Sequence, residues 1–200
     1  NLTAYPDFCE HLLGLDDEQL LDLLDKEVER GAFFEAARIV GFVEEAVFSW
    51  YVDRSIPADD RAATCSAIRP LLTQLALYRM DDLSAARSHD VLKSFYQALV
   101  PEPLRKALGE FYTPDWLADV ACDRAEVTDW SKVRALDPTC GSGSFLLEVI
   151  RRKRELADQA GFSPTDTLTR VLDEVWGFDL NPLAVQAART NFLIAIADLV

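Results

Sequence analysis

The segment LDPTCGSGSF, residues 136–145, places an acidic residue, a proline and two glycines between two apolar runs. The run KVRALD at 132–137 predicts a short buried strand, and SFLLEVIRRKRELADQAG at 144–161 predicts a helix. Gly141 and Gly143 can turn the chain between the two because they carry no Cβ atom. Such a turn exposes bare backbone beside the amide groups of a helix start, so we expect a ligand to lie against it.

The surrounding segments alternate between helix and strand patterns. The elements predicted there are a helix at 113–127 with Thr113 as N-cap and Pro114 at its first position, a helix at 163–175 capped by Ser163, a strand at 175–180 and a helix at 181–200. Helices that alternate with strands are typical of a parallel sheet, whose ligands bind at the carboxyl ends of the strands. We therefore expect the glycine loop and the end of the second strand to face the same ligand.

The first half of the chain has only helical patterns. Apolar residues recur at helical spacing in four segments, at 16–30, 34–52, 57–80 and 82–100. We expect Gly31 to end the first helix and Pro70 to kink or split the third. The segment VPEPLRKALGEFYTP at 100–114 flanks a short helix with prolines and a glycine. This punctuation predicts a helical domain over 1–100 and an incomplete α/β domain over 101–200.

Two sets of side chains each admit two interpretations. Four aromatic residues of the helical region could stack on nucleobases, but their helical spacing favours core packing: Trp50, Tyr51, Phe95 and Tyr96. The basic cluster RRKRE at 151–155 could contact phosphate, although a solvated helix face is the commoner role of such a cluster. The polar residues before Pro101 form no recognisable cluster, so we expect this region to contribute packing and placement.

Charge and composition exclude several classes of protein. The formal net charge is −14 and the isoelectric point is about 4.5, whereas nucleic-acid-binding surfaces are usually basic. If DNA or RNA is the substrate, we expect its main contact outside this segment. The sequence has no apolar run long enough to span a membrane and no signal-peptide pattern, which predicts a cytoplasmic protein with no membrane partner. It begins without Met, which suggests an internal piece of a longer polypeptide.

The cysteines do not follow a metal-ligand pattern. They are scattered without a C-x-x-C spacing, and the chain has only two histidines, so we expect neither a metal site nor a disulfide framework: Cys9, Cys65, Cys122 and Cys140. Cys140 lies in the glycine loop and could be a nucleophile. The nearby Asp137 would disfavour its thiolate and no histidine is close in sequence, so a small loop residue is the stronger hypothesis.

The acidic residues of the two strand ends indicate which ligand the loop takes. A dinucleotide-binding loop has the pattern G-x-G-x-x-G, but here Asp137 replaces the first glycine and no third glycine follows. A carboxylate there repels a pyrophosphate and attracts an ammonium or a sulfonium, and S-adenosylmethionine carries both cations. Asp179 ends the second strand, where it can accept hydrogen bonds from two ribose hydroxyls. An extra helix at 163–175 explains why it follows the loop at about twice the usual roughly 20 residues.

Three segments together resemble motifs X, I and II of the prokaryotic adenine-N6 DNA methyltransferases, in the order of the gamma class: ALGEFYTPDWLADV, LDPTCGSGSFLLEVI and VWGFDLNPLAVQAARTNF. The residues of these segments are similar to those of type IIG restriction-modification enzymes and of methyltransferases of BREX- or DISARM-like phage defence systems. The resemblance implies a helical bundle followed by the first part of a Rossmann-like class I S-adenosylmethionine-dependent methyltransferase fold. It also implies DNA as substrate and other defence-system subunits as possible partners.

The resemblance assigns a role to each cofactor-binding residue. The methionine end of the cofactor would be bordered by Phe111, Tyr112 and Thr113, and its amino acid moiety held by Asp137 and the loop of Thr139, Cys140, Gly141, Ser142 and Gly143. The ribose would be bound by Asp179, and the adenine bordered by Asn181 and Pro182.

The catalytic motif of the family is absent from this sequence. That motif is Asn/Asp-Pro-Pro-Tyr/Phe, which holds the target amine and stacks on a flipped-out base. The chain has no Pro-Pro dipeptide, and its Asn181-Pro182 pair follows motif II and lacks the aromatic residue. We therefore expect no catalytic residue here and two alternatives stay open. The parent could methylate RNA or a protein glutamine, or it could be a non-catalytic cofactor-binding module of a defence complex.

Overall fold

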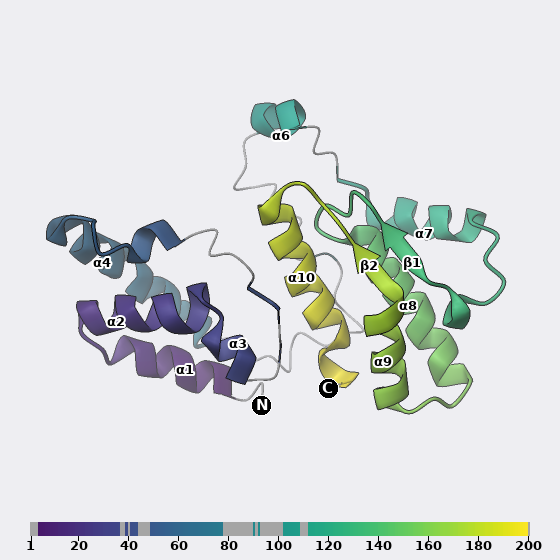
Figure 1. Ribbon diagram of the computed structural model, residues 1–200, viewed down its shortest axis with the longest axis horizontal. Coiled ribbons are helices and arrows are strands. Elements are labelled where there is room, and N and C mark those ends of the chain that lie inside the picture. The colour runs from purple at the N-terminus through teal and green to yellow at the C-terminus, as the bar shows by residue number, and fades with distance from the viewer. Residues whose placement is uncertain are drawn as a thin grey trace. The chain divides into compact units, whose positions relative to one another are not determined.

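The computed structural model describes residues 4–36, 39, 41–43, 49–77, 90, 92, 102–108 and 112–199. The chain divides into two compact units, Asn1–Asp82 and Leu83–Val200 (Figure 1). The boundary expected near residue 100 falls within the second unit.

The first unit is helical throughout the part that the structure describes. Its elements are α1 (Ala4–Leu13), α2 (Asp17–Leu23), the π-helix η1 (Leu24–Glu29), α3 (Ala32–Ala36), the 3-10 helix η2 (Ser49–Val52) and α4 (Ala58–Leu75). Helices α1, α2 and α4 pack together around a core of buried residues: Cys9, Leu12, Leu20, Leu21, Leu24, Val52, Cys65 and Leu72. Burial of each large apolar side chain there contributes about 1.5–3 kcal/mol to folding.

The helix expected from Asp16 is confirmed, with one difference in geometry. The Asp16 carboxylate caps α2 by accepting the amide of Gln19 at 2.9 Å, and the chain leaves the helix at Gly31, whose φ is +77°. From Leu24 onward the helix is π rather than α, and sequence periodicity does not distinguish the two.

Other expectations for the first unit are wrong. The single helix predicted at 34–52 is interrupted, because α3 ends at Ala36 and Gly41 turns the chain with a φ of +73°. Helix α4 continues through Pro70 without splitting. Trp50 is 68% exposed, which contradicts core packing for this residue, whereas Tyr51 packs against the core and donates a hydrogen bond to Glu29. The fourth segment, with Phe95 and Tyr96, lies almost wholly outside the described residues.

The second unit alternates helices and strands. Its elements are α6 (Glu102–Leu108), α7 (Asp115–Arg124), the 3-10 helix η5 (Trp130–Lys132), β1 (Ala135–Asp137), α8 (Ser144–Gln159), α9 (Pro164–Glu174), β2 (Val175–Gly177), α10 (Pro182–Ile196) and the 3-10 helix η6 (Ala197–Leu199). Strands β1 and β2 pair in parallel, with Ala135 opposite Val175 and Asp137 opposite Gly177. The predicted parallel pairing is thus confirmed, in strands shorter than the sequence suggested.

The caps of the second unit match the sequence at one position and differ at another. Ser163 caps α9 by accepting the amide of Asp166, as predicted. Thr113 is not the N-cap of α7. That position belongs to Pro114, whose φ of −60° and ψ of 145° are extended and whose side chain has no oxygen to accept an amide. Asn181 is the N-cap of α10, and its side chain accepts the amide of Leu183 at 3.0 Å.

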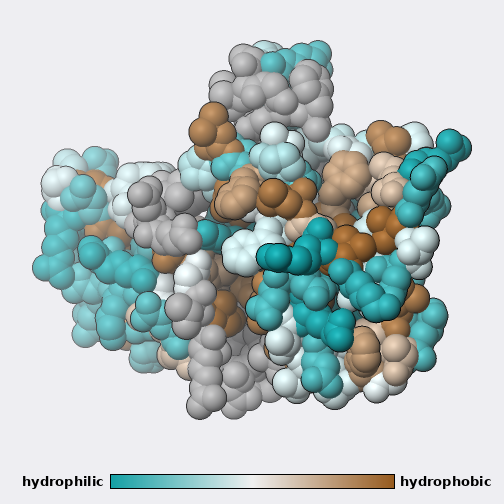
Figure 2. Space-filling model, turned by 45° about the vertical axis from the view of Figure 1, so that its right-hand side comes forward, coloured by the Kyte–Doolittle hydropathy of each residue, from teal (hydrophilic) through white to brown (hydrophobic). Residues whose placement is uncertain are grey.

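Helix α8 is the centre of the second unit. It contacts α7, α9, α10 and both strands (Figure 1). Leu146, Val149 and Ile150 of this helix are buried in the core of the unit. Gly177 allows β2 to approach closely, because a Cβ atom there would lie 2.6 Å from Leu146 Cδ1 and 3.1 Å from Cys140 Sγ. Hydrophobic patches also interrupt the polar surface on the face drawn in Figure 2. Large apolar side chains of the second unit that are exposed include Leu136, Trp176, Phe178 and Leu180.

Candidate functional site

The loop between β1 and α8 has the conformation expected from its glycines. Gly141 and Gly143 both have positive φ, at +55° and +95°, and the Gly143 amide donates to the Cys140 carbonyl at 2.8 Å. Apart from Gly141 itself and its two chain neighbours, no heavy atom of the described residues lies within 4 Å of the position that a Cβ atom of Gly141 would take. A Cβ atom at Gly143 would instead lie 3.4 Å from the Ala188 Cβ atom. The loop is therefore packed against α10 at Gly143 and open at Gly141.

Two carboxylates at the strand ends brace this loop. Asp137 Oδ1 accepts the amide of Thr139 at 3.0 Å. Asp179 accepts two backbone amides, that of Gly141 at Oδ2 (2.8 Å) and that of Asn181 at Oδ1 (2.9 Å). The structure thus brings the two predicted acidic residues to the same edge of the sheet, as parallel strands require.

Backbone hydrogen bonds extend the pairing of the two strand ends beyond β1 and β2. The Phe178 amide donates to the Asp137 carbonyl at 2.9 Å, and the Cys140 amide donates to the Phe178 carbonyl at the same distance. The loop is consequently attached to the chain that leads from β2 into α10. Some backbone amides of the loop that we expected to face a ligand, those of Cys140, Gly141 and Gly143, therefore donate to acceptors within the protein.

The other predicted residues occupy different environments. Thr139 is exposed, Ser142 is buried, and Pro182 is exposed at the first position of α10. Tyr112 and Thr113 are partly buried just before α7, and their place beside a ligand stays a prediction. Phe111 lies outside the described residues.

The environment of Cys140 is unsuited to a nucleophile. Burial, together with the neighbouring carboxylates of Asp137 and Asp179, raises the pKa of its thiol to about 11. The side chain is buried beneath the loop, where it fills the space next to Gly177. The structure therefore favours the role of a small loop residue.

A buried polar cluster behind the loop was not predicted. Asp90 accepts hydrogen bonds from the hydroxyls of Ser142 and Ser144, the latter at 2.9 Å, and from the side-chain amide of Asn191 at 2.7 Å. The Asn191 amide also donates to the Ser142 carbonyl at 3.0 Å. In the sequence, Asp90 is one acid among many in a helical pattern. Asn191 does carry a signal, as a polar residue within the apolar run NFLIAIA.

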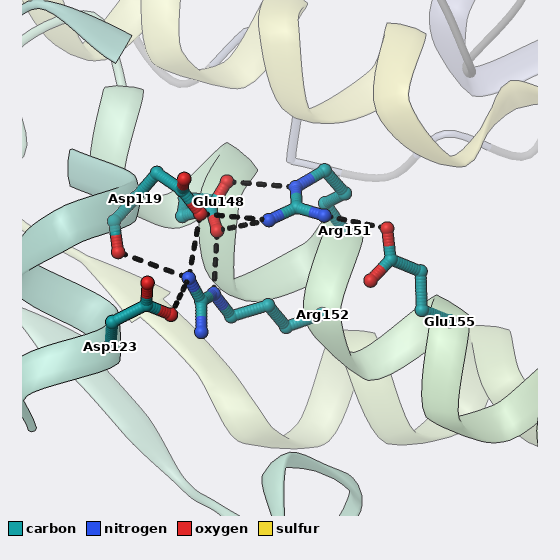
Figure 3. Close-up of polar contacts among 6 residues, drawn as sticks. All are labelled: Asp119, Asp123, Glu148, Arg151, Arg152 and Glu155. Carbon is teal, nitrogen blue, oxygen red and sulfur yellow. Dashed lines mark hydrogen bonds and ion pairs between the residues drawn. The ribbon is translucent and has the colours of Figure 1, made fainter. Parts of the chain in front are cut away.

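The basic cluster on α8 is occupied by internal ion pairs. Arg151 pairs with Glu148 and Glu155, and Arg152 bridges from Glu148 to two acids of α7, Asp119 and Asp123 (Figure 3). The hydrogen bond from Arg152 is the largest of the contacts that lower the pKa of Asp119. These contacts join α8 to α7.

The remaining two cations of the cluster point to other elements. Lys153 is only 3% exposed and pairs with Glu174 at the end of α9, so it does not lie on a solvated face. Arg154 pairs with Asp198 in η6. Because all four cations have carboxylate partners, the structure gives no support to phosphate contact by this cluster.

Three general features of the described ranges bear on function, and they concern membrane-spanning helices, metal-ligand groups and disulfides. None of their helices is long and apolar enough to cross a bilayer. Their His, Cys, Asp and Glu side chains nowhere gather into a group of three or more that could ligate a metal ion. The four cysteines are buried free thiols.

Comparison with known proteins identifies the family. The family described as N-6 DNA Methylase matches residues 87–199. Over 111 residues the chain is 34% identical to the adenine-specific methyltransferase PglX of Streptomyces coelicolor (strain ATCC BAA-471 / A3(2) / M145). This alignment covers 52% of the chain and 9% of PglX. The chain is 28% identical, also over 111 residues, to the type II methyltransferase M.VspI of Vibrio sp. (strain 343). This alignment covers 52% of the chain and 22% of M.VspI.

These relatives are much longer than the matched segment, so the chain spans only a small part of the proteins it resembles. No solved structure gave a significant match. The family match itself covers more than half of the chain, with both strands and the loop between β1 and α8 inside it. The chain therefore belongs to the N-6 DNA methylase family.

Proposed function

We propose that this chain is the cofactor-binding part of a DNA adenine-N6 methyltransferase and that its loop between β1 and α8 binds S-adenosylmethionine. The observation that carries the proposal is the position of Asp137 and Asp179. Both carboxylates lie at the carboxyl ends of parallel strands, beside a loop that is open at Gly141. Asp137, in place of the first glycine of a dinucleotide loop, favours a ligand with cationic groups, and Asp179 supplies an acceptor for a ribose hydroxyl.

We expect this ligand to bind without rearrangement of the loop. Each oxygen of Asp179 accepts one backbone amide and has a second lone pair with which it can accept a ribose hydroxyl. Asp137 is partly exposed and can face the ammonium group, with Thr139 and Gly141 beside it. Asn181 and Pro182 at the start of α10 would border the adenine, and Phe111, Tyr112 and Thr113 the methionine end. When bound, the cofactor supplies an electrophilic methyl group on its sulfonium.

The methyl acceptor is proposed to be adenine in DNA, held by parts of the parent protein outside this chain. The N-6 DNA methylase family and the relative PglX, which is named an adenine-specific methyltransferase, support this acceptor. The chain has no Pro-Pro dipeptide and a net charge of −14, so neither base positioning nor the main DNA contact is expected from it. We further propose a cytoplasmic restriction-modification or phage-defence enzyme, in keeping with the resemblance to such systems.

Calorimetric titration of the chain with S-adenosylmethionine, its demethylated product and NAD tests the cofactor assignment. We expect binding of the first two and not of NAD. Asp137→Asn keeps the oxygen that accepts the Thr139 amide but removes the charge, so it should weaken binding of S-adenosylmethionine by about 10- to 100-fold. Asp158→Asn, on the exposed end of α8, is the matched control and should bind like the wild type. Preferential binding of NAD would refute the assignment.

A further inference from the structure

The glycine loop is held from two sides by carboxylates. Asp179 accepts the amide of Gly141 on the side where the loop is open, and Asp90 accepts the hydroxyl of the next residue, Ser142. Ser142 is 1% exposed and Asp90 is 6% exposed, so this second contact is buried. Adjacent residues of the loop are thus attached to two different parts of the second unit.

Asp90 also connects the loop to both helices that follow a strand. One carboxylate oxygen accepts from Ser142 in the loop and from Ser144 at the first position of α8. The other oxygen accepts from Asn191 of α10, which is 2% exposed and donates in turn to the Ser142 carbonyl. Side chain and backbone of Ser142 are therefore both fixed through the same pair of residues.

Within the part of the chain that the structure describes, the Ser142 amide is less restrained than the amides of its neighbours. The amides of Cys140, Gly141 and Gly143 have partners in the protein, at Phe178, Asp179 and Cys140 respectively. Two of the residues in this turn are glycines with positive φ, for which the unfolded chain has more conformations to lose. Ser142 lies between the two glycines, and its hydroxyl donates to the buried Asp90 carboxylate. Any loop conformation that broke this hydrogen bond would leave a buried polar group unsatisfied, which is costly, so the contact limits the conformations of the turn.

We propose that Asp90 is a positioning residue of the cofactor site, which fixes the loop between β1 and α8 in the conformation that binds S-adenosylmethionine. The inference rests on the proposed function for the identity of the ligand, and on the hydrogen bonds of Asp90 for its mechanism. It places the start of the functional domain before Asp90 rather than at residue 101. The family match, which begins at residue 87, is consistent with this earlier start.

Two substitutions of Asp90 and one control separate positioning from general stability. Asp90→Ala removes both acceptor oxygens. Asp90→Asn keeps one oxygen and should rescue part of the effect, because serine hydroxyls can accept as well as donate. The control Glu174→Ala, at the end of α9, removes the carboxylate partner of the buried Lys153 of α8, so it destabilises the same unit without removing a contact of the loop.

The first measurement is hydrogen exchange of the chain without any ligand, at a temperature where all variants are folded. For Asp90→Ala we expect exchange at least about 10-fold faster in peptides covering 139–147, with α9 unchanged, and an intermediate rate for Asp90→Asn. Glu174→Ala should speed exchange in α9 and not in the loop. Equal loop exchange in wild type and Asp90→Ala would overturn the inference.

The second measurement is calorimetric titration with S-adenosylmethionine. Asp90→Ala should bind at least about 10-fold more weakly than Glu174→Ala, with Asp90→Asn between the two. Wild-type affinity in an Asp90→Ala variant whose loop exchanges fast would overturn the positioning role while leaving the proposed function intact. A wild-type chain that does not bind the cofactor, but whose loop depends on Asp90, would refute the proposed function and with it the cofactor part of the inference.

Discussion

Asp179 combines a structural contact with the proposed ribose contact in one side chain. Its two oxygens accept the amides of Gly141 and Asn181 and so connect the loop to the N-terminus of α10. A ribose hydroxyl would meet oxygens that are already oriented, which lowers the entropy cost of binding. The same arrangement means that a substitution here affects the ligand and the loop together.

For Asp179→Ala we therefore expect S-adenosylmethionine to bind about 10- to 100-fold more weakly, as lost charge-assisted hydrogen bonds usually cause. Asp179→Asn should also be impaired, because its amide nitrogen would face one of the two backbone amides, a donor against a donor. Calorimetry on variants with native circular dichroism measures both. An unchanged dissociation constant in folded Asp179→Ala would show that Asp179 is not the ribose partner.

The Cys140 thiol gives a prediction for stability at high pH. Its pKa is raised from 9.0 to about 11, so between these values the unfolded chain releases a proton that the folded chain keeps. The contribution of the neutral thiol to stability is complete below pH 9 and is lost as the pH rises through 11. The free energy of unfolding of wild type should thus fall faster with pH than that of Cys140→Ala.

Urea unfolding of both proteins at several values between pH 8 and pH 11 is the corresponding experiment. Other thiols, such as that of Cys122, also have a raised pKa, but they contribute equally to both proteins. Parallel stability curves for wild type and Cys140→Ala would contradict the assignment of a raised pKa to this residue.

Local sequence signals were sufficient to predict the conformation of some residues but not the contacts of others. The roles of Gly141, Gly143 and Ser163 follow from neighbours a few positions away, and the structure has them as predicted. Asp90 and Asn191 lie 101 residues apart, and nothing in the pattern around either one indicates the other. Buried polar pairs of this kind depend on tertiary packing, which a single sequence does not specify.

Among the elements, α8 carries most of the contacts of the second unit. Its apolar face packs on the strands and on α10, while its charged residues pair with α7, α9 and η6. The side chains of RRKRE therefore form ion pairs between helices, although a run of cations usually lies on a solvated surface. Lys153 is the clearest case, because it is buried and paired with Glu174.

Glu174→Ala should lower the free energy of unfolding by about 2–3 kcal/mol, since it leaves the buried Lys153 ammonium without this carboxylate. This value is near the lower end for buried pairs because Glu174 is partly exposed. Glu155→Ala, which breaks an exposed pair with Arg151, should cost less than about 0.5 kcal/mol. Urea unfolding, monitored by tryptophan fluorescence, measures the free energy of unfolding of both variants.

The double variant Lys153→Met with Glu174→Leu tests the cause of that loss. It should recover most of the stability, because neither charge then remains buried. A double variant as unstable as Glu174→Ala would mean that Glu174 acts through something other than its ion pair with Lys153.

The element pattern was predictable where apolar periodicity was long and well punctuated. Helices α8, α9 and α10 and the parallel pairing of β1 with β2 agree with the sequence. The break after Ala36 was missed because apolar residues continue at helical spacing through Gly41, where the backbone turns. A positive φ at one glycine outweighs a periodicity that several neighbours support.

For the whole molecule, the charge decides what the chain can do alone. A protein with a net charge of −14 binds DNA weakly at physiological salt, since affinity for the phosphate backbone depends on cations. The best candidates for such cations on α8 are paired internally. Weak DNA binding by this chain stays a prediction from composition, whereas the internal ion pairs of the α8 cations could be seen only in the structure.

Residues 1–200 alone should consequently transfer no methyl group to DNA. A parent chain that extends through an Asn-Pro-Pro-aromatic motif and a recognition domain should produce N6-methyladenine, because the target amine must be held in line with the sulfonium. The assay is transfer of tritium from labelled cofactor to duplex DNA, followed by nucleoside analysis. Methylation by residues 1–200, or methylcytosine as the product of the parent, would contradict the proposed function.

The close approach at Gly177 has a consequence for protein engineering. Strand, loop and helix meet there within van der Waals distance, through Gly177, Cys140 and Leu146. A loop transplanted from a relative with a bulkier residue in place of Cys140 would collide with β2, and one with a smaller residue would leave a void beside it. Segments exchanged between members of this family should therefore be cut outside 137–179, so that both strand ends move as one unit with the two helices between them, α8 and α9.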